Sequence, residues 1–131
     1  MIKVRVIIEI LGSPKEHVEE IINKVVKKIE TEEKDIKLLN GKSYEATEVK
    51  GLWSTFAELE LEFNKLYDLI GFSFDYMPSV IEILEPEKMN IEMGDVNELL
   101  NDLLAKLHNY DMVTKNLSAE NILLKRQLEK K

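Results

Sequence analysis

Residues 95–131 read DVNELLNDLLAKLHNYDMVTKNLSAENILLKRQLEKK, a segment in which apolar side chains recur at a fixed spacing. Ten positions follow one another in alternating steps of four and three residues: Val96, Leu100, Leu103, Leu107, Tyr110, Thr114, Leu117, Asn121, Leu124 and Leu128. A period of about 3.5 residues predicts a long helix with a coiled-coil seam. Asn121 is an amide in this seam, and a single seam Asn fixes the register and the number of paired strands.

The apolar stripe of this helix is wider in its first half than in its second. The wide part consists of Val96, Leu99, Leu100, Leu103, Leu104 and Leu107. A wide stripe is typical of a helix that packs on a globular core. The weak helix formers of residues 108–111 are the place where a break would fall, although the heptad phase continues through them. Two arrangements stay open: a straight helix that finds a partner, or a bend near Asn109 that buries Ile122 and Leu123 against the same chain.

Residues 116–128 resemble a leucine zipper, including the polar seam position at Asn121. Leucine-zipper transcription factors carry a basic region directly upstream of the zipper. Here the upstream segment, residues 95–111, contains one basic residue, Lys106. The resemblance therefore implies pairing of helices and not binding of DNA.

The first 94 residues alternate between strand and helix patterns. Apolar and polar residues alternate in residues 2–11 and 52–63, which predicts two clear strands. Between them, residues 14–33 have the apolar stripe of an amphipathic helix. The remaining expected elements are irregular strands at 36–39 and 44–49, a short helix at 65–70 and a short strand at 80–84.

Several residues in these segments predict where the elements begin and end. Ser13 and Glu16 form a capping box, with Pro14 at the first position of the helix. Asn40-Gly41 is a strong hairpin signal, although a bulged strand is equally compatible with its short flanks. We expect Asn64 to cap the short helix and Gly71 to end it. Asp95, with Glu98 three residues later, is the expected start of the long helix.

The order strand, helix, strand, strand, short helix, strand resembles the ferredoxin-like superfold over residues 1–86. The resemblance implies that the first and third strands are antiparallel neighbours. Lys3 and Arg5 would then lie beside Glu58, Glu60 and Glu62, a stabilising arrangement of opposite charges. The predicted fold class is thus α+β: a ferredoxin-like βαββαβ antiparallel sheet in residues 1–94, followed by a long amphipathic, coiled-coil helix in residues 95–131.

Composition excludes several classes of function. The chain has 131 residues, a net charge of −7 and no Cys, so it has neither disulfides nor a thiolate metal site. Residues 51–95 contain 2 basic and 10 acidic side chains, which disfavours nucleic acid and suits a basic protein surface. No apolar run is long enough to span a bilayer, so we expect a cytoplasmic protein with no membrane partner. Frequent Lys, Glu and Ile are typical of thermophiles.

Few residues are candidates for chemistry. His17 and Glu20 have a spacing compatible with metal binding, but no third ligand accompanies them. The strand glutamates could attract a hard cation, but the sequence has no dense ligand loop. None of the common nucleophile, phosphate-loop or metalloprotease motifs occurs, so we predict no enzyme and no cofactor. The aromatic residues that could form a ligand pocket or partner patch are Trp53, Phe56, Phe72, Phe74 and Tyr76.

We therefore expect a non-catalytic adaptor, scaffold or regulatory module that forms a homodimer through its C-terminal helix. The dimer would be parallel if Asn121 pairs with its symmetry mate. The predicted oligomerisation residues are Leu100, Leu103, Leu107, Tyr110, Leu117, Asn121, Leu124 and Leu128. The helix could instead capture a helix of another protein. The alternative function is a small-molecule sensor with a pocket near Phe72–Met77.

Overall fold

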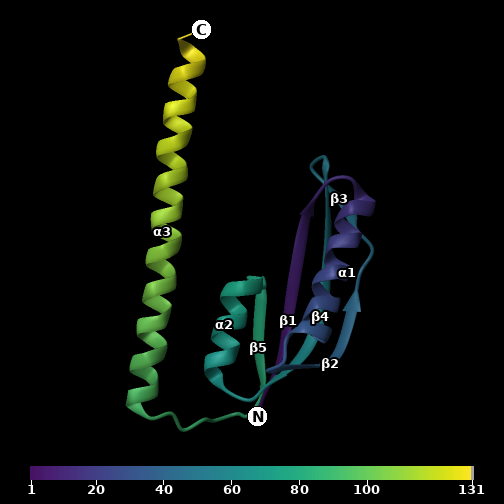
Figure 1. Cartoon of the computed structure of the whole chain (residues 1–131). Coiled ribbons are helices and arrows are strands. Elements are labelled where there is room, and N and C mark those ends of the chain that lie inside the picture. The colour runs from purple at the N-terminus through teal and green to yellow at the C-terminus, as the bar shows by residue number, and fades with distance from the viewer. Residues whose placement is uncertain (131) are drawn as a thin grey trace. The chain divides into compact units, whose positions relative to one another are not determined.

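The computed structural model describes residues 1–130, in which two compact units are separated between Met89 and Asn90. The first unit is α+β, and the second contains one long helix (Figure 1). In chain order the elements are β1 (Ile2–Gly12), α1 (Lys15–Glu32), β2 (Ile36–Ser43), β3 (Thr47–Val49), β4 (Leu52–Phe63), α2 (Leu66–Tyr76), β5 (Val80–Glu85) and α3 (Met93–Glu129).

The strands form one antiparallel sheet in the order β2-β4-β1-β5, and β3 pairs with β4 beside β2. The longest pairing joins β1 to β4, from Ile2 opposite Phe63 to Gly12 opposite Trp53. The sequence predicted these two strands as antiparallel neighbours, and the register confirms it. The α+β class, the antiparallel sheet and the long C-terminal helix are also confirmed.

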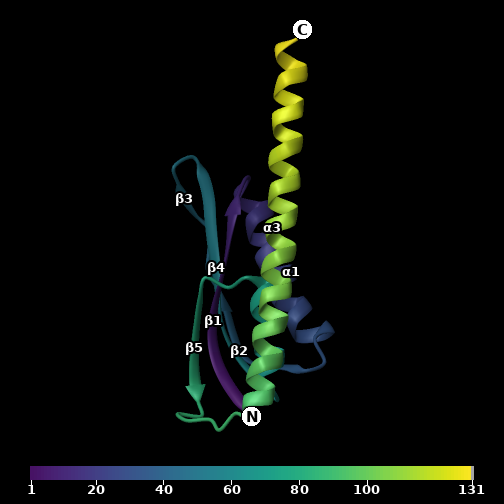
Figure 2. The same cartoon turned by 90° about the vertical axis from the view of Figure 1, so that its left-hand side faces the viewer.

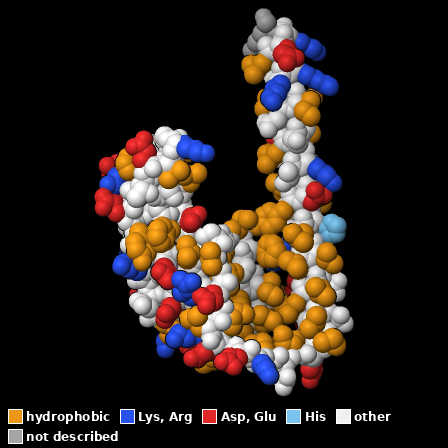
Figure 3. All heavy atoms as spheres, turned by 180° about the vertical axis from the view of Figure 1, so that it is seen from behind, with side chains coloured by type: hydrophobic (Ala, Val, Ile, Leu, Met, Phe, Trp, Pro, Cys, Tyr) orange, Lys and Arg blue, Asp and Glu red, His pale blue; other side chains and the backbone are white. Residues whose placement is uncertain are grey.

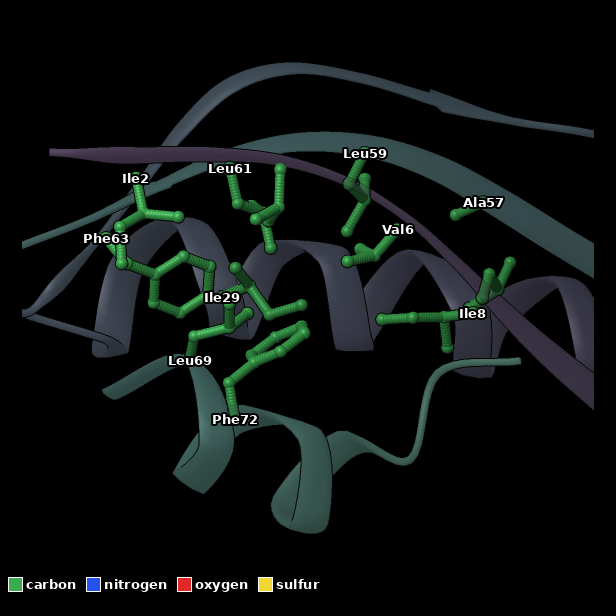
Figure 4. Close-up of a cluster of buried hydrophobic side chains, with 12 residues drawn as sticks. Ile2, Val6, Ile8, Ile29, Ala57, Leu59, Leu61, Phe63, Leu69 and Phe72 are labelled. Carbon is green, nitrogen blue, oxygen red and sulfur yellow. The ribbon is translucent and has the colours of Figure 1, made fainter. Parts of the chain in front are cut away.

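The core lies between one face of the sheet and the two shorter helices. Every second residue of β1 from Ile2 to Ile8 is buried, as is every second residue of β4 from Thr55 to Phe63. Figure 2 shows α1 on one side of the sheet, and Figure 4 shows side chains of the strands, α1 and α2 meeting in one cluster. The buried Thr55 hydroxyl donates a hydrogen bond to the backbone carbonyl of Tyr44. Because its hydroxyl is hydrogen-bonded, burial of Thr55 does not carry the free-energy cost of an unsatisfied polar group.

Two glycines near the sheet edge have different roles, and of the two arrangements predicted at Asn40-Gly41 the bulged strand is confirmed and the hairpin is not. Strand β2 continues through Gly41 with a bulge between Leu38 and Asn40. A Cβ at Gly41 would lie 3.0 Å from Cδ2 of Leu59, so glycine permits close packing there. The tight turn is instead Lys50-Gly51, where both residues have positive φ (50° and 83°) between β3 and β4. Positive φ at both central residues is the hairpin turn that matches strand twist.

The predicted caps of the first two helices, Ser13, Asn64 and Gly71, are wrong, and Lys65 takes the N-cap position of α2 in place of Asn64. Helix α1 begins at Lys15 with Pro14 as its N-cap and no side-chain cap bond, so Ser13 does not form the capping box. Helix α2 passes through Gly71, and its left-handed C-cap is Met77. Continuing the helix places Phe72 and Tyr76 on the side of Leu69, where they pack on the core. That burial outweighs the roughly 1 kcal/mol cost of a helical glycine.

Helix α3 runs without a break from Met93 to Glu129 and includes residues 108–111 (Figure 1). It begins two residues before Asp95, and its N-cap Glu92 makes no side-chain cap bond. The predicted capping box at Asp95 is therefore wrong. At 1.5 Å per residue the helix is about 55 Å long. No helix in residues 1–130 combines the length and apolarity that a bilayer crossing requires.

Candidate functional site

The candidate site is the seam of helix α3, which we define as the ten positions from Val96 to Leu128 spaced by alternating steps of four and three. An unbroken helix places residues three and four apart on one side. The uninterrupted course of α3 therefore aligns the predicted oligomerisation residues Leu100, Leu103, Leu107, Tyr110, Leu117, Asn121, Leu124 and Leu128 along one stripe.

The seam is exposed along most of its length. Every residue from Leu107 to Lys130 is exposed, and no described residue of α3 is buried. The exposed fraction is 55% at Leu117, 56% at Leu124 and 71% at Leu128. Figure 3 shows hydrophobic side chains at the surface along this helix. Exposed apolar residues that recur along one face of a helix make that face a candidate interaction site.

The structure distributes the five predicted patch aromatics over both faces of the sheet. Phe72 is 3% exposed, lies edge-on to Phe63 at 5.5 Å and stacks on Tyr76 at 4.9 Å between ring centroids. Phe56 lies on the opposite face of β4 and stacks on Tyr44 at 4.3 Å. Phe72 and Phe56 therefore contribute to two separate aromatic groups.

The other two predicted aromatics do not join these groups into one patch. Trp53 shares a sheet face with Phe63, but ten residues of strand, about 33 Å, separate them. Its ring lies 5.5 Å from Nζ of Lys15 instead. Phe74 is half-buried on helix α2. Sequence alone missed Tyr44 as the stacking partner of Phe56, because the bulge in β2 changes which residues share a face.

Tyr76 links helix α2 to the end of helix α1. Its hydroxyl donates a 2.6 Å hydrogen bond to the Glu33 carboxylate. The pKa of Tyr76 is raised well above its ordinary value of 10. The larger cause is burial of the ring, and the second is this hydrogen bond to the Glu33 carboxylate. Tyr76 therefore remains protonated and acts as a structural donor. The pair is 43 residues apart, so no local sequence signal predicts it.

The sheet face that α1 and α2 leave uncovered is charged and internally paired. Arg5 donates to Glu58 at 2.7 Å and to Glu82 at 3.1 Å, and Lys3 lies 4.0 Å from Glu60. The hydrogen bond to Glu58, and secondly the one to Glu82, raise the pKa of Arg5. The sequence predicted the attraction between β1 and β4, and these contacts confirm it.

This alternation of charge extends across all four long strands. One row of cross-strand partners, Lys37, Glu62, Lys3 and Glu85, alternates across all four strands; in the next row Glu60, Arg5 and Glu82 alternate, and β2 contributes the neutral Asn40. Opposite charges on neighbouring strands stabilise a solvated face. The acidic side chains of β4 are therefore compensated by bases from β1 and β2 and do not form one acidic surface.

Residues 1–130 contain no group of three His, Cys, Asp or Glu side chains arranged to hold a metal ion. His17 and Glu20 both lie on α1, and His108 lies on α3.

Comparison with known proteins identifies a family but no activity. Residues 3–129 match the MJ0538 family, and the chain belongs to that family. No curated protein and no solved structure matches the chain.

Proposed function

We propose that this chain of the MJ0538 family is a non-catalytic scaffold or adaptor module that joins two copies of its α+β unit by pairing of helix α3. The observation that carries the proposal is the exposed seam, which extends without interruption from Leu107 to Leu128. Water contact with these side chains is unfavourable, and a second apolar helix removes it. Self-association is thus the role that this surface supports best.

The α+β unit supports this assignment because its own core is complete without the second half of α3. Its buried cluster is supplied by β1, β4, α1 and α2. The exposed residues from Leu107 onward contribute nothing to that cluster. Their apolar pattern therefore calls for an explanation other than folding of the first unit.

Electrostatics support a protein partner over nucleic acid. Lys3 and Arg5 on the uncovered sheet face are held by glutamates. Binding of nucleic acid depends on basic groups that neutralise phosphates. A basic partner for the acidic middle of the chain is also less favoured than a second copy, because Glu58 and Glu82 already pair with Arg5.

The order of elements supports a ferredoxin-like assignment for the first unit. When Thr47–Val49 is counted as an extension of the sheet edge, four strands remain in the order β2-β4-β1-β5. Along the chain, helix α1 follows β1 and helix α2 follows β4. This order and these connections support the ferredoxin-like βαββαβ arrangement that we propose for residues 1–94.

The small-molecule sensor is the weaker proposal. Its pocket would require the aromatic segment near Phe72 to be available to a ligand. Phe72 and Tyr76 instead pack against Phe63, Leu69 and the rest of the core. A thermal-shift screen with a metabolite panel tests it, and stabilisation that is lost in Phe72→Leu would favour the sensor.

The oligomeric state tests the main proposal. We expect light scattering to give twice the chain mass of 15.2 kDa for the full chain and the single-chain mass for Leu117→Asp. Leu123→Asp is the matched control, because Leu123 is equally exposed (56%) on the same helix but lies outside the seam. A monomeric full chain would overturn the proposal, as would equal effects of the two substitutions.

A further inference from the structure

We infer that two α3 helices pair parallel and in register, with ion pairs between Lys106 and Asp111 and between Glu120 and Lys125 of the two copies. This inference rests on the proposed self-association and adds its geometry. Four charged residues flank the seam. Lys106 and Glu120 directly precede the seam residues Leu107 and Asn121, and Asp111 and Lys125 directly follow Tyr110 and Leu124.

In a parallel coiled coil, the residue before one seam position meets the partner's residue five places further along, after the next seam position. Lys106 and Asp111 are five residues apart and opposite in charge, and so are Glu120 and Lys125. Two-fold symmetry forms each pair twice. All four contacts in this arrangement are therefore attractive.

An antiparallel pair with full overlap of the seam is less favourable. In that arrangement Tyr110 lies opposite Thr114 of the second copy. The residue that directly follows Tyr110 then meets the residue that follows Tyr110 of the second copy. The two copies of Asp111 would then approach each other near the symmetry axis, which is repulsive. The Lys106–Glu120 contacts would remain attractive, so the antiparallel arrangement is mixed where the parallel one is uniformly attractive.

Asn121 distinguishes the two directions independently of charge. In the parallel, in-register pair its amide faces the same amide of the second copy, and both can donate and accept. In the antiparallel pair it faces Leu103, and a one-heptad shift of the parallel pair places it against Thr114 or Leu128. A seam amide without its mate is penalised, because a buried polar group loses its water without gaining a partner.

The charges of the isolated helix are consistent with this assignment. Glu120 has no basic residue three or four places away on its own helix, so a pair with Lys125 of the second copy would not compete with one within the helix. Asp111 is held by Lys115 at 2.8 Å, and its second oxygen can accept Lys106 of the other copy. In a parallel pair, the N-terminal ends of the two α3 helices lie at the same end of the coiled coil.

Disulfide formation tests direction and register directly, since the chain has no Cys of its own. We expect full-length Leu117→Cys to form a same-residue disulfide dimer in a glutathione redox buffer, seen on a non-reducing gel. Leu123→Cys, equally exposed but outside the seam, should not. In the antiparallel arrangement Leu117 lies opposite Leu107, so a mixture of Leu107→Cys and size-tagged Leu117→Cys chains would give the mixed disulfide.

A dimer by light scattering that forms only the mixed disulfide would overturn the parallel inference and leave the proposed function standing. A monomer would overturn both. Same-residue disulfides at Leu117 without mixed disulfides support the inference.

Charge reversal supplies a second readout that needs no cysteine. Glu120→Lys alone and Lys125→Glu alone should each weaken dimerisation about tenfold at low salt, because like charges then meet in both copies of the pair. Mixing the two variants should restore affinity as a heterodimer, since each new Lys then faces a new Glu. In the antiparallel arrangement Lys125 approaches Asn97, so an unaffected Lys125→Glu homodimer would overturn the inference.

Discussion

Strand β4 and helix α3 both carry apolar residues at the regular spacing of their secondary structure, yet the two patterns have different outcomes. The inward residues of β4, from Thr55 to Phe63, are completely buried. The seam leucines of α3 from Leu107 onward are at least half exposed. The difference shows that periodicity identifies which face of an element is apolar but not what covers it. For the seam of α3, we propose that a second copy of the helix supplies this cover.

The largest effect that distinguishes these regions is expected in the core. Phe63→Ala should lower the free energy of unfolding by about 3–5 kcal/mol, because it removes a fully buried ring that contacts Phe72. Phe56→Ala is the matched control on the opposite face of the same strand, where we expect about 0.5–1.5 kcal/mol from the lost stacking on Tyr44. Urea denaturation followed by Trp53 fluorescence measures both. Equal losses would contradict the assignment of β4 faces.

A second, smaller effect is expected at Asn121, in the C-terminal half of the seam. Asn121→Leu should tighten self-association by about 1.5–3 kcal/mol per side chain, since an amide is replaced by an apolar group that becomes buried. The same change should broaden the distribution of masses, because the residue that specifies the number of strands is lost. Sedimentation velocity at several concentrations measures both properties. Unchanged affinity and a single mass would mean that Asn121 lies outside the interface.

The strands and helices that were predicted correctly have a strong internal period. Alternation from Ile2 to Ile10 and from Trp53 to Phe63 places each side chain on a definite face, and the sheet uses those faces. The pairing of Arg5 with Glu58 followed from that alternation once the two strands were taken as neighbours. The seam of α3 was likewise visible, since the helix continues in phase for its whole length.

The predictions that failed depended on single residues whose local preference was overridden by packing. Gly71 was expected to end a helix, but the core contacts of Phe72 and Tyr76 extend it. For Asn40-Gly41 the sequence predicts either a hairpin turn or a bulged strand; the bulge in β2 confirms the second, and the Leu59 side chain lies close to the glycine. The proposed aromatic patch divided because Phe56 and Phe72 come from opposite sides of the sheet. Such long-range contacts, like Tyr76 with Glu33, have no counterpart in a local sequence pattern.

The smallest expected effect concerns the ion pair between Lys15 and Glu45, which joins the start of α1 to the segment between β2 and β3. Their charged atoms lie 2.6 Å apart, and the backbone amide of Ala46 donates to Glu19 of the same helix. The contact with Lys15 lowers the pKa of Glu45 below its ordinary 4.5, and the contact with Glu45 raises the pKa of Lys15 above its ordinary 10.5.

The sign of the pH dependence follows from these two shifts. A carboxyl whose pKa is lowered by folding stabilises the folded state above 4.5, and that contribution is lost as the pH falls through the folded value. An ammonium whose pKa is raised stabilises the folded state below 10.5, and that contribution is lost as the pH rises through the folded value. Lys15→Met should therefore lower the melting temperature slightly between these limits and less so in acid or at high salt. Lys27→Met, which removes an exposed cation from the same helix, is the control, and an equal loss at every pH in both variants would contradict a role for the Lys15–Glu45 pair.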